Sequence, residues 1–147
     1  LPELSARRGT QIAKARAGRL IEVMRDEMKP NYLAEGPGKE PILDLCMDMA
    51  MSLGPAVFER QSQALSTRTD QQETLRTYRG DALVLMGEQD RLCSRNRHDL
   101  MHALLKHSRL AVVTGAGHRP TLEQPEETAR ELTSWLAGFP ELDRACR

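Results

Sequence analysis

The spacing of apolar residues divides this chain into two parts of different character. Residues 1–79 place apolar side chains at helical intervals and contain no convincing strand, whereas residues 80–147 alternate short continuous apolar runs with helical patterns. Continuous apolar runs are typical of strands buried on both faces, and their alternation with helices predicts a parallel sheet. The sequence therefore predicts an α/β fold, in which a helical segment over 1–79 precedes two parallel strand–helix units over 80–147.

Turn-forming residues separate the helices of the first part. We expect a helix around 5–17 that Gly18 separates from the next one. Apolar side chains from Leu20 to Met28 then recur at helical spacing and form an amphipathic stripe, which ends at Pro30.

The segment from 41 to 53 is apolar around most of its circumference. We expect a helix there that is either deeply packed or lines a ligand cavity. A Gly-Pro pair at 54–55 separates it from a further helix, which has one apolar face over 58–65. The spacing of Thr69 and Gln72 is that of a capping box, which predicts a short last helix.

The second part predicts two strands and two helices in alternation. A strand at 82–86 precedes a helix near 95–106, and a strand at 109–114 precedes a helix over 125–137. Two parallel strands are too few to stand alone, and the first strand keeps an unpaired edge unless another chain or a missing segment covers it. Since the sequence begins with Leu1 rather than Met, we expect a truncated or processed chain that is the tail of a larger doubly wound sheet.

An acidic residue and a histidine follow these two strands. Asp90 ends the sequence Gly-Glu-Gln-Asp after the first strand, and His118 ends Gly-Ala-Gly-His after the second. The carboxyl ends of parallel strands share one edge of a sheet, where chemistry collects. We therefore expect a carboxylate oxygen of Asp90 to lie roughly 2.6–3.2 Å from an imidazole nitrogen of His118. A carboxylate that orients an imidazole is two thirds of a nucleophilic triad.

These two loops resemble a known family. Residues 87–92 resemble the acid loop of the α/β-hydrolases, and residues 115–126 resemble their histidine loop. Residues 80–138 fit the C-terminal part of that fold, and residues 1–79 are similar in character to the helical cap that many members insert. Arg119 departs from the family pattern, which often has a small or apolar residue after the histidine. The resemblance implies the C-terminal portion of an α/β-hydrolase, with a helical cap segment.

The resemblance also implies a chemical role for each residue of the pair. Asp90 would orient and polarise the imidazole of His118, which would act first as general base and then as general acid. The implied activity is cofactor-free hydrolysis of an ester or related acyl bond in a small-molecule substrate. The same fold hosts other reactions, so the reaction type stays open. Glu123 would mark the turn into the last helix, as a structural hydrogen-bonding group or a surface charge.

The sequence offers no clear match to the nucleophile of this family. The family places it in a G-x-S-x-G elbow between a strand and a helix, and no such string occurs here. The nearest candidate is Ser52, but the residues before it have helical spacing, so we expect it on a helix and away from His118. We expect the nucleophile in a segment before Leu1, and we expect the isolated chain to be inactive. The alternative is a non-catalytic remnant or a partner module of the same fold.

Composition narrows the partners and the compartment. The chain carries 21 Lys and Arg against 21 Asp and Glu, and only 3% of its residues are aromatic, which argues against nucleic-acid binding. No segment approaches the roughly 20 consecutive apolar residues of a membrane span, and the polar, basic start argues against a signal peptide. The three cysteines, Cys46, Cys93 and Cys146, form no CxxC pair. We expect free thiols in a reducing cytoplasm.

One further group of residues could bind a metal by residue type. His98 and His102 are four residues apart, and Cys93 and His107 lie nearby in the sequence. A metal site needs three or four convergent ligands. We expect surface or boundary histidines here, and neither a metal nor a cofactor.

Overall fold

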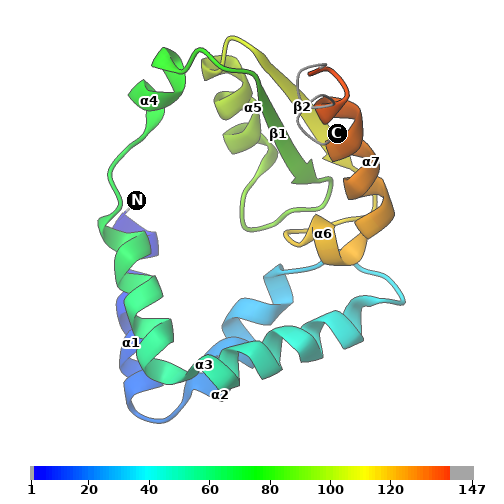
Figure 1. Ribbon diagram of the computed structural model, residues 1–147. Helices are drawn as coiled ribbons and strands as arrows, with labels where there is room; N and C mark the ends of the chain where they lie inside the picture. The colour runs from blue at the N-terminus through cyan, green and yellow to red at the C-terminus, as the bar shows by residue number, and fades with distance from the viewer. Residues whose placement is uncertain (1, 140–147) are drawn as a thin grey trace, which may run out of the picture. The chain divides into compact units, whose positions relative to one another are not determined.

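The structure is a computed structural model that describes the backbone of residues 2–139 and the side chains of residues 7–139. The chain forms two compact units. Unit 1 contains the chain up to Tyr32 together with Pro37–Asp70, and unit 2 contains Leu33–Gly36 together with the chain from Gln71 onward. Figure 1 labels the helices α1 to α7 and the strands β1 and β2.

Unit 1 is helical, as the sequence predicts. Its elements are α1 (Pro2–Arg16), α2 (Leu20–Glu22), the π-helical turn η1 (Val23–Met28), the 3-10 turn η2 (Lys29–Asn31) and α3 (Lys39–Thr67). The stripe from Leu20 to Met28 is therefore helical, but most of it has the wider π-helical winding, which apolar spacing alone does not reveal. The core of the unit is formed by buried apolar side chains of these elements, which include Ala15, Leu20, Val23, Met24 and Leu43.

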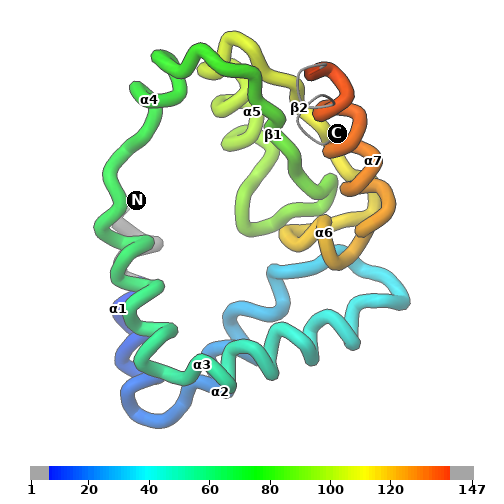
Figure 2. The backbone as a smooth tube through the Cα atoms, in the orientation of Figure 1, coloured from blue at the N-terminus to red at the C-terminus, as the bar shows by residue number. Residues whose placement is uncertain are grey.

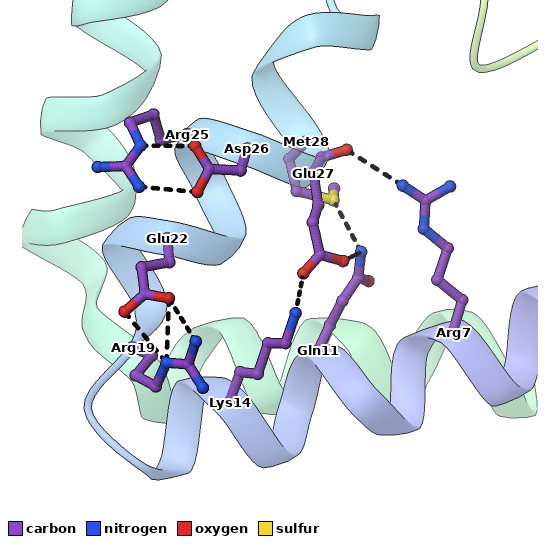
Figure 3. A network of polar contacts seen from close by, with 9 residues as sticks. All are labelled: Arg7, Gln11, Lys14, Arg19, Glu22, Arg25, Asp26, Glu27 and Met28. Carbon is purple, nitrogen blue, oxygen red and sulfur yellow. Dashed lines mark hydrogen bonds and ion pairs between the residues drawn. The ribbon is translucent and has the colours of Figure 1, made fainter.

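A cluster of polar contacts joins α1 to the π-helical turn. Glu27 accepts hydrogen bonds from Lys14 Nζ at 2.7 Å and from Gln11 Nε2 at 3.0 Å, and its backbone oxygen accepts one from Arg7 at 3.4 Å. Figure 3 shows these three donors on one face of α1. The hydrogen bond from Lys14, followed by that from Gln11, lowers the pKa of Glu27 below its ordinary value.

Gly54 breaks α3 into two helices. Its φ of 76° and ψ of 176° lie outside the helical region, in backbone space that glycine tolerates far better than other residues. Pro55 follows the break and suits the first turn of the second helix. Figure 2 shows the two parts of α3 running in different directions.

Two expectations about this segment need correction. By length and composition alone α3 is apolar enough to cross a membrane, although each part on either side of Gly54 is shorter than the roughly 20 residues of a span. The segment is also not deeply packed within the described structure. Cys46 is buried, but Leu45, Met49 and Leu53 are each about half exposed, with Met49 at 56%.

Unit 2 contains the two predicted strand–helix units. Its elements are α4 (Gln72–Thr77), β1 (Ala82–Gly87), α5 (Arg95–Leu104), β2 (Ser108–Val113), α6 (Pro120–Glu123) and α7 (Pro125–Leu136). The short helix α6 is not predicted by the sequence pattern. The predicted capping box is wrong in its position, because the N-cap residue of α4 is Gln71 and not Thr69.

The two strands pair in parallel, with Ala82 opposite Ser108 and Gly87 opposite Val113. Buried side chains alternate along both strands and come from Val84, Met86, Ala111 and Val113. Helix α5 packs against both strands, and α7 packs against β2. In the part of the chain that the structure describes, the sheet has two strands, so each strand has one unpaired edge there.

Candidate functional site

The loops after β1 and β2 begin at the same end of the sheet, because the parallel register places Gly87 opposite Val113. Backbone hydrogen bonds join them directly. The Glu88 N–H donates to the Val113 carbonyl at 3.0 Å, and the Gln89 N–H donates to the Ala116 carbonyl at 2.8 Å. The acid loop and the histidine loop therefore form one continuous piece of structure.

Gly87 makes this close approach possible. A Cβ atom at this position would lie 2.0 Å from the Gly117 carbonyl oxygen and 2.5 Å from that of Ala116. No side chain fits there, since backbone atoms on both loops would have to separate. Gly115 starts the histidine loop with a φ of 69°, which few residues other than glycine adopt.

Asp90 and His118 meet at this edge, as predicted. The side chain of Asp90 is 5% exposed, and its Oδ2 lies 2.9 Å from His118 Nδ1. Its other oxygen, Oδ1, accepts the N–H groups of Leu92 and Cys93, each at 2.8 Å. Both carboxylate oxygens are therefore engaged, and the carboxylate plane is fixed with one oxygen toward the imidazole.

The surroundings of Asp90 favour its ionised form. Burial by itself raises the pKa of Asp90, but the N–H of Cys93, the His118 imidazole and the N–H of Leu92 together hold that pKa below its ordinary value. An ionised carboxylate can only accept a hydrogen bond, so we assign the proton of His118 to Nδ1. Nε2 then carries the lone pair, which is the arrangement that a general base needs. The side chain of His118 is 31% exposed, so other molecules can reach the ring.

Glu123 accepts hydrogen bonds from three backbone N–H groups, two of which lie in the histidine loop. Its Oε1 lies 2.9 Å from the Gly117 nitrogen and 2.6 Å from the Ala34 nitrogen, and its Oε2 lies 2.9 Å from the Gly117 nitrogen and 3.0 Å from the Arg119 nitrogen. Of the two roles considered from the sequence, the structure shows the structural hydrogen bond. The sequence gives the loop spacing, but it gives no signal for the contact with Ala34.

Among the residues whose side chains the structure describes, one group could hold a metal by residue type and spacing. The ligand atoms of Asp90, Cys93 and His118 lie within 4.8 Å of one another. However, Asp90 Oδ2 and His118 Nδ1 already bond to each other, so a metal ion would have to replace that bond. The Asp–His hydrogen bond accounts for this arrangement without an ion.

The histidines of α5 have partners of their own. His98 is buried, unlike the surface or boundary position expected, and its Nδ1 lies 3.2 Å from the Ser94 carbonyl oxygen. His102 Nδ1 lies 2.8 Å from the Ser108 hydroxyl. Cys46 and Cys93 are free thiols, and Cys146 lies outside the described residues.

Ser52 lies within α3, on an exposed helical turn before the break at Gly54. The prediction that it is helical is confirmed. A nucleophile elbow needs a strand immediately before the serine, and among residues 2–139 both strands come after Ser52 in the chain.

No protein-family model and no curated protein matches this sequence. Solved structures do match. An esterase from Thermogutta terrifontis is 23% identical with a TM-score of 0.85, and the alignment covers 94% of this chain and 51% of that one. An esterase from Exiguobacterium antarcticum is 21% identical with a TM-score of 0.77, and the alignment covers 90% of this chain and 48% of that one. MGS-M2, an α/β-hydrolase from a Medee basin deep-sea metagenome library, is 16% identical with a TM-score of 0.70. That alignment covers 93% of this chain and 52% of the MGS-M2 chain.

These alignments cover nearly all of this chain but only about half the length of each solved structure. The helical segment and the two parallel strand–helix units follow in the order expected for the end of that fold. The chain therefore has the fold of the C-terminal half of an α/β-hydrolase.

Proposed function

We propose that Asp90 and His118 are the acid and the base of a hydrolase that cleaves an ester or related acyl bond in a small molecule. The observation that carries the proposal is the 2.9 Å contact between Asp90 Oδ2 and His118 Nδ1. Two backbone N–H groups fix the other oxygen of Asp90. Such an arrangement selects one tautomer and one orientation of the imidazole, which is the function of the acid in a nucleophilic triad.

The chemistry divides into two proton transfers through Nε2 of His118. In the first, Nε2 takes the proton of a serine hydroxyl while the serine oxygen bonds to the carbonyl carbon of the substrate. The ionised Asp90 stabilises the imidazolium that results, and Nε2 then gives its proton to the departing alcohol oxygen. A water molecule repeats the sequence on the acyl-enzyme, which releases the carboxylic acid and restores the serine.

The serine of this mechanism comes from outside the chain. The described part of the chain supplies two strands with an unpaired edge each, and the solved structures that it resembles are about twice as long. A segment before Leu1, or another chain, would extend the sheet and bring the nucleophile elbow and the oxyanion donors. We therefore propose that the 147-residue chain alone does not turn over esters.

The test is ester hydrolysis by the longer polypeptide that is encoded when the upstream DNA is included. Turnover of p-nitrophenyl butyrate should disappear in His118→Ala. A matched control is His107→Ala, because His107 is an exposed histidine outside both loops. Full turnover in His118→Ala would contradict the role proposed for His118. An upstream sequence with no segment that completes the sheet would favour a non-catalytic module of the same fold.

A further inference from the structure

The contacts of Glu123 point to a role beyond ending a helix. Its carboxylate accepts the N–H groups of Gly117 and Arg119, which are the residues on either side of His118. The orientation of the His118 side chain depends on the backbone around it. The Glu123 carboxylate bonds the peptide that follows His118, through the Arg119 N–H, and the peptide that precedes Gly117, through the Gly117 N–H. A shift of this carboxylate therefore moves the imidazole relative to Asp90.

The third N–H comes from a distant part of the sequence. Ala34 donates to Glu123 Oε1 at 2.6 Å across 89 residues of chain. The contact is tight, because a Cβ atom on Gly117 would lie 2.7 Å from the Ala34 nitrogen and 2.7 Å from the Leu33 carbonyl carbon. Leu33 is 1% exposed, so this short segment is firmly buried beside the histidine loop.

Residues Leu33–Gly36 belong to unit 2, although the chain before and after them belongs to the helical unit 1. The Glu123 side chain accepts hydrogen bonds both from this segment, at Ala34, and from the histidine loop, at Gly117 and Arg119. Hydrogen bonds to an ionised acceptor are the stronger class in proteins, which suits a carboxylate better than an amide at this position.

We propose that Glu123 is a positioning residue for His118: it accepts the N–H groups of the residues on either side, Gly117 and Arg119, and links them to the Ala34 backbone. The proposal rests on the catalytic role of His118 proposed above. It says that Glu123 acts on the reaction through the placement of the imidazole and does not touch the substrate.

The test compares Glu123→Gln with Glu126→Gln. The glutamine at 123 keeps one carbonyl oxygen and gains an NH2 group that cannot accept, so either Ala34 or Arg119 loses its acceptor. Glu126 is an exposed acid in the first turn of α7, so its variant removes the same charge close by. In the longer, active polypeptide we expect Glu123→Gln to lower kcat about tenfold, Glu123→Ala to lower it about 100-fold, and KM to change less than about twofold.

A second readout does not depend on activity. In the longer polypeptide, proton NMR should show the His118 Nδ1–H in its hydrogen bond to Asp90, and this signal should broaden or disappear in Glu123→Gln but persist in Glu126→Gln. The indole N–H of Trp135 reports whether α7 stays folded. An unchanged Nδ1–H signal with unchanged kcat in Glu123→Gln would overturn the positioning role.

The two proposals fail in different ways. Ester turnover that survives His118→Ala contradicts the catalytic role, whereas the NMR result still decides the role of Glu123. If Glu123→Gln does not fold, hydrogen exchange in the unmodified chain tests whether Glu123 holds these backbone groups. The amides of Ala34, Gly117 and Arg119 should be protected together, and exchange at the rate of a free peptide would contradict the proposal.

Discussion

Replacement of Asp90 by Asn should abolish turnover in the longer polypeptide while leaving the fold nearly intact. The amide oxygen of the asparagine should take the position of Oδ1, because the N–H groups of Leu92 and Cys93 both need an acceptor there. Its NH2 group then faces His118 Nδ1, which must become the acceptor. The imidazole proton moves to Nε2, and Nε2 can no longer accept a proton from a nucleophile.

The expected loss follows from this change of tautomer. The equivalent substitution in a well-studied serine protease triad lowers kcat by about 10⁴, which is about 5.4 kcal/mol of transition-state stabilisation. In the opposite orientation, the amide oxygen would accept the His118 Nδ1–H, but the NH2 group would face the N–H groups of Leu92 and Cys93. Because those two groups would lose their acceptor, we expect the orientation that places the amide oxygen at the position of Oδ1. Asp90→Ala is a poorer test, since it leaves both backbone donors without an acceptor, at a cost of about 1–3 kcal/mol each.

The assay is hydrolysis of p-nitrophenyl butyrate by the longer polypeptide, with thermal melting to confirm the fold. Asp81→Asn is the matched control, because Asp81 is an exposed aspartate just before β1. A kcat for Asp90→Asn within about tenfold of the unmodified protein would refute the assignment, since loss of a proton-accepting Nε2 cannot be that mild.

Three further outcomes follow from the geometry. The folded-state pKa of Asp90 is lowered, so its contribution to stability should be present above the unfolded-state pKa of about 3.9 and be lost as the pH falls through the lower folded value. In urea unfolding, the difference in unfolding free energy between the unmodified chain and Asp90→Asn should therefore shrink on acidification. A difference that grows would contradict this sign. Gly87→Ala places a Cβ 2.0 Å from a carbonyl oxygen and should cost about 3 kcal/mol or more of unfolding free energy, whereas Gly36→Ala, with nothing within 4 Å, should change it by less than about 0.5 kcal/mol. The isolated chain should self-associate through its unpaired strand edges, and sedimentation that shows a stable monomer would contradict this.

The sequence predicted the parts of the site that local patterns determine. The two apolar runs gave β1 and β2, and the geometry of parallel strands then brought the loops of Asp90 and His118 to one edge. Gly87 could be named as a turn residue, but its closeness to the Gly117 carbonyl depends on the packing of two loops, which no local pattern encodes.

Long-range contacts account for most of what the sequence did not predict. The bond between Glu123 and Ala34 spans 89 residues, and no spacing rule connects them. Cys93 is close in sequence to the histidines of α5, yet the structure places it beside Asp90 and His118. The helical period of 41–53 predicted α3 correctly, but it could not show that Met49 would be left exposed in the described structure.

The most direct test of the central claim is to locate the nucleophile that His118 serves. A fluorophosphonate probe reacts with an activated serine, and mass spectrometry identifies the residue that carries it. We expect the longer polypeptide to be labelled on a serine that precedes Leu1. This labelling should be lost in His118→Ala, and the 147-residue chain should not be labelled. Labelling of Ser52 or of any other residue within the chain, or labelling that persists in His118→Ala, would contradict this prediction.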